Sequence, residues 1–175
     1  MHPTRTYHYL VKSRAMLFAW IRPLSPEQYA STPPVGLGSL ARTLHHTMAA
    51  EWLYMQRING RTEPLGPLDP EHDPEPADPL PFPALESTWT EQASQTGTDL
   101  AALLEARVDW HEPLTYRTVL KSGPATYDAS RSDMFTQLAL HEVHHRAQAL
   151  NMLRRLGVET GELDFNSLMF LPGHP

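Results

Sequence analysis

The chain has 175 residues with a formal net charge of −6, and it contains no cysteine. This length suits one well-buried core, so we predict a single domain over residues 1–175. No apolar run approaches the roughly 20 residues of a membrane span, and the N-terminus lacks the apolar core of a signal peptide. The lack of cysteine excludes disulfides, zinc–thiolate sites and a cysteine nucleophile, so the cytoplasm is the expected location and no membrane partner is expected.

Acidic charge and proline are concentrated in residues 62–83. This segment holds six acidic residues, no Lys or Arg, and eight of the 17 prolines. The density of proline predicts an extended crossover without helix or central strand. The rest of the chain carries 14 acidic and 14 basic residues. A neutral body with an acidic loop is a poor counterion for phosphate backbones, so no nucleic-acid partner is expected.

Apolar periodicity predicts four long helices, over residues 4–22, 39–58, 84–107 and 130–156. A short helical turn is expected at 25–29, with Ser25 as its N-cap and Pro26 at its first position. Residues 115–120 form an alternating run with β-branched side chains, and residues 121–124 supply a turn. Together they favour a strand or hairpin there. The expected fold class is all-α, a four-helix bundle with a long Pro-rich crossover between its second and third helices.

The last predicted helix carries His141 and His145, four residues apart on one face. Two neutral imidazoles in this arrangement can ligate one divalent metal at roughly 2.0–2.1 Å. Their face also carries apolar residues such as Leu138 and Met152, which predicts that both imidazoles are buried. Each then needs a hydrogen-bond partner or a bound metal. With ten histidines in the chain, a chance pair of hydrogen-bonded core histidines is the plain alternative.

Residues 141–145 also match the zincin pattern HExxH. No third-ligand pattern follows His145, and the only later histidine is His174. Glu142 lies about 100° around the helix from His141, which places it off the core face. A metalloprotease is therefore not expected.

A third ligand is better sought at His45-His46 in the second long helix. The segments SLARTLHHTMAAEWLY (39–54) and HEVHHRAQ (141–148), with the LSPEQY turn (24–29), together resemble the DinB/YfiT-like superfamily. The resemblance implies an up-down-down-up four-helix bundle whose divalent metal is held by three histidines, one from the second helix and two from the last. The usual ending HxxxHRGQ appears here with Ala147 in place of glycine.

Carried over residue by residue, the resemblance implies His46, His141 and His145 as metal ligands. Periodicity alone leaves His45 and His46 open. The family pattern places the ligand five residues before a glutamate, here Glu51, and so favours His46. The residues expected to lie around the ligands, without binding the metal, are Glu51, Glu142, Gln148 and His144.

Three histidine ligands leave a coordination position for water or substrate, and Zn or Ni is the most expected metal, with Fe or Cu open. Superfamily members include S-transferases and an isomerase that use low-molecular-weight thiols such as mycothiol or bacillithiol. The expected function is thus a metal-dependent enzyme with a small-molecule substrate and thiol S-transfer as the leading reaction. The alternatives are a non-enzymatic metal-binding or stress-associated module, and a metal-dependent hydrolase with Glu51 or Glu142 as base.

A homodimer is also expected, because the second and the last long helix each carry apolar residues on two sides. On the last helix, the side opposite the predicted ligands carries Ala139, Val143, Ala147 and Leu150. An apolar second side favours a partner subunit. The alternative is that these residues contact the first and third long helices of the same chain.

Overall fold

The computed structural model describes residues 2–31, 36–61, 78–120 and 123–170. It is mostly helical, as predicted, with a small antiparallel sheet. The helices are α1 (Pro3–Ile21), α2 (Pro26–Ala30), α3 (Leu40–Ile58), α4 (Phe82–Glu105), α5 (Arg131–Arg155) and α6 (Phe165–Met169). The strands are β1 (Pro113–Leu120) and β2 (Gly123–Ser130). The central part of the predicted crossover, residues 62–77, lies outside the described residues.

The helix boundaries follow local side-chain chemistry. Ser39 accepts a hydrogen bond from the Arg42 amide at the start of α3, and Ser130 and Asp133 form a capping box at the start of α5. Helix α4 begins at Phe82, two residues before the predicted start at 84. Pro83 did not prevent this, because proline in the first turn gives up an amide that the helix does not use.

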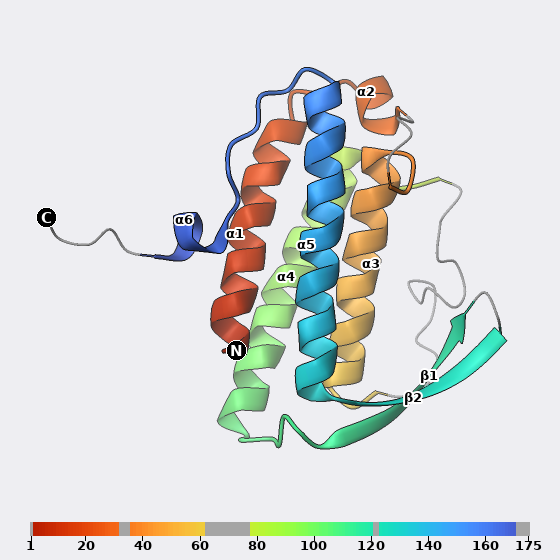
Figure 1. Ribbon diagram of the computed structural model, residues 1–175, viewed down its shortest axis with the longest axis vertical. Helices are drawn as coiled ribbons and strands as arrows, with labels where there is room; N and C mark the ends of the chain where they lie inside the picture. Colours follow the sequence, from red (N-terminus) through yellow and green to blue (C-terminus); the bar gives the residue numbers. More distant parts are fainter. Residues whose placement is uncertain (1, 32–35, 62–77, 121–122, 171–175) are drawn as a thin grey trace, which may run out of the picture.

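The four long helices lie side by side, with α1 and α5 running in one direction and α3 and α4 in the other (Figure 1). Helix α1 packs against α4 and α5, and α3 packs against the same two helices. Their apolar side chains form two separate core clusters. One, toward α2, includes Phe18, Leu44, Trp89 and Met152, and the other, toward the hairpin, includes Leu10, Ile58, Leu100 and Phe135.

Polar side chains occupy the layer between the two apolar clusters. On α1 this layer holds Ser13 and Arg14, on α3 it holds Glu51, and on α5 it holds Glu142 and Arg146. All five are buried, with exposed fractions of 6% or less. The interior is therefore apolar at both ends and polar in its middle, and this middle layer lies beside the predicted metal ligands.

Strands β1 and β2 form a hairpin at one end of the helices, so the all-α class omits one element of the fold (Figure 1). Tyr116 pairs with Tyr127 across the strands, and their rings are stacked with centroids 5.7 Å apart. The Arg57 guanidinium lies 4.2 Å from the Tyr116 ring centroid and donates to the Arg117 carbonyl. These contacts hold the hairpin to α3, and the alternating, β-branched sequence favours strand over helix here.

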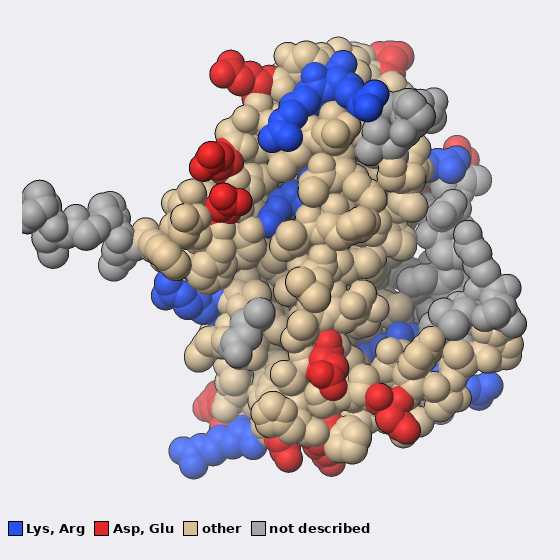
Figure 2. All heavy atoms as spheres, viewed as in Figure 1, with Lys and Arg blue, Asp and Glu red and all other residues tan. Residues whose placement is uncertain are grey.

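The face of the molecule formed by α5 carries few charged side chains at its centre (Figure 2). Lys and Arg in this view are scattered and do not join into one basic patch. Among the described residues, we find no helix with the length and apolar content needed to cross a bilayer.

Candidate metal centre

His46, His141 and His145 come together where α3 packs against α5. The Nε2 atom of His141 lies 3.1 Å from Nε2 of His46 and 3.1 Å from Nε2 of His145. One nitrogen from each ring falls within 4.8 Å of the other two. The structure thus assembles the three residues that the sequence predicted as ligands.

This spacing fits a metal ion. Zinc bonds of roughly 2.0–2.1 Å in a tetrahedral arrangement place neighbouring ligand nitrogens about 3.3 Å apart. The Nε2 pairs at 3.1 Å are close to that value. All three groups that would bind the ion are imidazole nitrogens, which suit zinc, nickel, iron or copper.

The protonation of the cluster also suits a metal. Burial, together with the neighbouring His145, His46 and His144, lowers the pKa of His141 to about 3. Burial lowers the pKa of His145 as well. Both rings are therefore neutral near pH 7, and only a neutral imidazole offers a nitrogen lone pair to a cation.

Gln148 joins His145 to His144. The His145 Nδ1 lies 2.9 Å from the Gln148 Oε1, and the Gln148 Nε2 lies 2.9 Å from the His144 Nε2. In this arrangement Nδ1–H of His145 donates to the amide oxygen, which leaves Nε2 of the same ring unprotonated toward the cluster. Gln148 therefore contacts a predicted ligand, as expected, and His144 lies beside it on the exposed side.

The structure separates the two neighbouring histidines of α3. His45 Nδ1 accepts a hydrogen bond from the Leu80 amide at 3.4 Å, whereas His46 faces α5. Residues one apart on a helix point about 100° away from each other, so only one can join the cluster. His46 is the residue that meets His141, in agreement with the family pattern.

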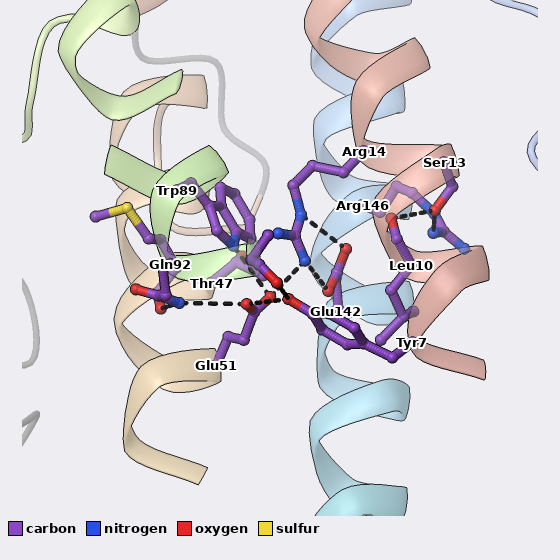
Figure 3. Close-up of polar contacts among 12 residues, drawn as sticks. Tyr7, Leu10, Ser13, Arg14, Thr47, Glu51, Trp89, Gln92, Glu142 and Arg146 are labelled. Carbon is purple, nitrogen blue, oxygen red and sulfur yellow. Dashed lines mark hydrogen bonds and ion pairs between the residues drawn. The ribbon is translucent and has the colours of Figure 1, made fainter. Parts of the chain in front are cut away.

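Glu51 and Glu142, which were expected to lie around the ligands, share one buried partner on α1. Both carboxylates bind the Arg14 guanidinium on α1 (Figure 3). Arg14 and Glu142 are each 4% exposed, and Glu51 is 2% exposed. Burial by itself would lower the pKa of Arg14, but Glu142 and Glu51 raise it, so the guanidinium stays charged.

Glu51 also accepts hydrogen bonds from two other helices. Tyr7 on α1 donates to its Oε1 at 2.8 Å, and Trp89 on α4 donates to its Oε2 at 3.0 Å. Gln92 adds a longer contact to Oε1 at 3.3 Å (Figure 3). Burial, together with Glu51, raises the pKa of Tyr7, so its phenol remains a donor. Through Glu51 and Arg14 all four long helices meet at one point.

The prediction that Glu142 lies off the core face of its helix is wrong. Its side chain is buried between α5 and α1, because Arg14 reaches across to it from the neighbouring helix. The sequence holds a sign of this. Arg14 lies at helical spacing from Tyr7, Leu10 and Ile21, in the apolar stripe of α1. A cation in such a stripe requires a buried acidic partner.

A family model for the DinB family matches residues 1–172 of the chain. The chain belongs to the DinB family. The match covers nearly the whole sequence, including the segments that hold His46, His141 and His145. A search of the curated proteins finds no match to this DinB-family chain.

Proposed function

We propose that this DinB-family protein is a divalent-metal-dependent enzyme whose metal is held by His46, His141 and His145. The observation that carries the proposal is the convergence of three Nε2 atoms, with two contacts of 3.1 Å, from two helices. Two hydrogen-bonded imidazoles would need only one such contact, whereas three converging nitrogens form the donor set of a metal site. A fourth coordination position remains for water or substrate, as in catalytic three-histidine sites.

The leading reaction is S-transfer from a low-molecular-weight thiol to a small electrophile. A divalent ion in the site would lower the pKa of a coordinated thiol and stabilise it as thiolate. The chain has no cysteine, so the sulfur nucleophile would come from a cosubstrate. His46, His141 and His145 would bind and orient the metal, and Gln148 would hold His145 in the ligating tautomer.

Hydrolysis is the second candidate, and the structure gives it less support. A hydrolase would use a nearby carboxylate as base. Glu51 and Glu142, the two carboxylates close in sequence to the ligands, both bind Arg14 inside the core. The oxygens of both carboxylates already accept hydrogen bonds from Arg14, and those of Glu51 also accept from Tyr7 and Trp89, so neither carboxylate is positioned to take a proton from water at the proposed metal. This favours S-transfer over hydrolysis.

The reaction is tested with zinc- and nickel-loaded protein, a thiol such as mycothiol or bacillithiol, and an electrophile such as a bimane or chlorodinitrobenzene. S-transfer predicts turnover that requires thiol and disappears in the triple variant His46→Ala, His141→Ala, His145→Ala. Ester or amide cleavage without thiol would favour the hydrolase. Metal binding without turnover in either assay would favour a non-enzymatic metal-binding or stress-associated module.

We also infer that the four long helices form the up-down-down-up bundle of the DinB type, which their directions support (Figure 1). A homodimer through the outer side of α5 is part of the same proposal. Of the residues predicted to face a partner, Val143 is 39% exposed and lies near Leu140, which is 61% exposed, whereas Ala139 is 6% exposed and packs in the core of the same chain. Light scattering on the wild type and Leu140→Glu would show a dimer and a monomer, respectively; a monomeric wild type would contradict it.

A further inference from the structure

The backbone at Gly36, in the loop before α3, lies directly against the Gln148 side chain. Gly36 has φ of +56°, in the left-handed region. A Cβ atom at this position would lie 2.5 Å from Gln148 Oε1 and 2.8 Å from its Cδ. Side chains do not approach this closely, so any residue other than glycine would displace the Gln148 amide.

The Gln148 amide has two hydrogen-bonding ends, and both face histidines. Its oxygen is 2.9 Å from His145 Nδ1 and its nitrogen is 2.9 Å from His144 Nε2. A neutral imidazole carries one proton, and the hydrogen bond at one nitrogen decides which lone pair is free at the other. The position of the amide thus decides whether His145 offers Nε2 to the cluster or blocks it with a proton.

We propose that Gly36 and Gln148 act together as positioning residues for the metal centre. The loop backbone at Gly36 holds the Gln148 amide against His145, and the amide keeps His145 protonated on Nδ1 with Nε2 open toward His46 and His141. This inference rests on the proposed function for its role in metal binding. Its structural part, the tautomer of His145, exists in the metal-free protein and can be tested separately.

The same loop supplies a matched control. Gly38 also has a left-handed φ, +94°, but a Cβ atom there would meet nothing within 4 Å. Alanine is strained at both positions, and no less so at Gly38, whose φ lies outside the left-handed helical region that other residues sometimes adopt. Only Gly36→Ala adds a collision with Gln148. A difference between the two variants therefore reports the contact and not the strain.

The first test is zinc affinity, measured by competition with a chromogenic chelator in Gly36→Ala, Gly38→Ala, Gln148→Ala and the double variant Gly36→Ala/Gln148→Ala. Loss of a residue that orients a ligand costs about 10–100-fold in metal affinity, so Gln148→Ala should weaken binding by that factor. Gly36→Ala should weaken it comparably and Gly38→Ala much less. The double variant should bind no more weakly than Gln148→Ala, because the collision partner is gone.

Equal losses in Gly36→Ala and Gly38→Ala, or additive losses in the double variant, would overturn the proposed coupling. The second test reads the tautomer by ¹⁵N–¹H correlation of the imidazole nitrogens in the metal-free protein near pH 7.5. His145 should carry its proton on Nδ1 in the wild type and in Gly38→Ala. In Gly36→Ala and Gln148→Ala a population protonated on Nε2 should appear. A wild-type His145 protonated on Nε2 would overturn the proposal, whether or not the protein binds metal.

Discussion

Two polar clusters lie close together inside this protein, and only one of them is built around a cationic side chain of the chain itself. The cluster of Arg14, Glu51 and Glu142 contains its own cation, because the guanidinium binds both carboxylates. The cluster of His46, His141 and His145 brings together three imidazole nitrogens of one kind. The first is a completed ion-pair network that joins helices. The second could hold a divalent cation from outside, as we propose, so the first should govern stability and the second metal binding.

The largest effect is expected from Arg14→Met. Removing the guanidinium leaves Glu51 and Glu142 buried without their cation, and breaking a buried pair in this way costs about 3–5 kcal/mol of unfolding free energy. Urea denaturation measures this value. Arg22→Met is the matched control, because Arg22 pairs with Glu86 on the surface, and it should change the midpoint little. Similar effects of both variants would contradict a special role for Arg14.

The next effect separates His46 from its neighbour. A ligand present at about 100 times its Kd stabilises the folded state by about 2.7 kcal/mol. Zinc at that excess should stabilise the wild type and His45→Ala by this amount, and His46→Ala far less. The measurement is the urea midpoint with and without zinc. Loss of zinc stabilisation in His45→Ala alone would show that the wrong residue of the pair has been assigned.

Tyr7→Phe tests whether the Arg14 cluster can be weakened without touching the histidines. The variant keeps the ring but removes the donor to Glu51 Oε1. Hydrogen bonds to charged groups contribute roughly 1.5–3 kcal/mol, and the low end is expected here because Gln92 still reaches the same oxygen. Zinc affinity should stay within a few-fold of the wild type. A large loss of zinc affinity would mean that the two clusters do not act separately.

A pH dependence follows from the depressed pKa of His141 in the metal-free protein. The folded pKa is about 3 and the ordinary value is 6.5, so below pH 6.5 the unfolded chain binds the proton more readily. Stability should therefore fall as pH drops from 6.5 to 5, by at most about 1.4 kcal/mol per pH unit for this group. His141→Ala should show a shallower slope in urea titrations at several pH values. If the pH dependence of stability were the same in His141→Ala, groups other than His141 would be responsible for it.

Much of the helical frame was predictable because its signals are local. Ser39, Ser130 and the apolar spacing of α3 and α5 determine where those helices begin and which side they bury. That His141 and His145 share one helical face could be predicted from their spacing alone. The choice of His46 over His45 needed the family resemblance, because both positions are half-buried.

The remaining features depend on contacts between distant segments. The partner of Glu142 is Arg14, and that pair depends on how α1 packs against α5. The approach of Gly36 to Gln148 likewise depends on the path of a loop far away in sequence. The glycine at position 36 and the arginine in the apolar stripe of α1 could have been recognised from the sequence as unusual. The sequence does not indicate which distant residues they contact. The hairpin was indicated by its β-branched alternation, although the all-α class omitted it.

The most direct test of the central claim is elemental analysis of the purified protein beside the triple variant His46→Ala, His141→Ala, His145→Ala, both after incubation with zinc or nickel and removal of excess metal. Circular dichroism confirms that the variant remains helical. We predict about one equivalent of metal in the wild type and none in the variant, as a single three-histidine site requires. A wild type without metal, or a folded variant that retains it, would contradict the assignment of these histidines as ligands.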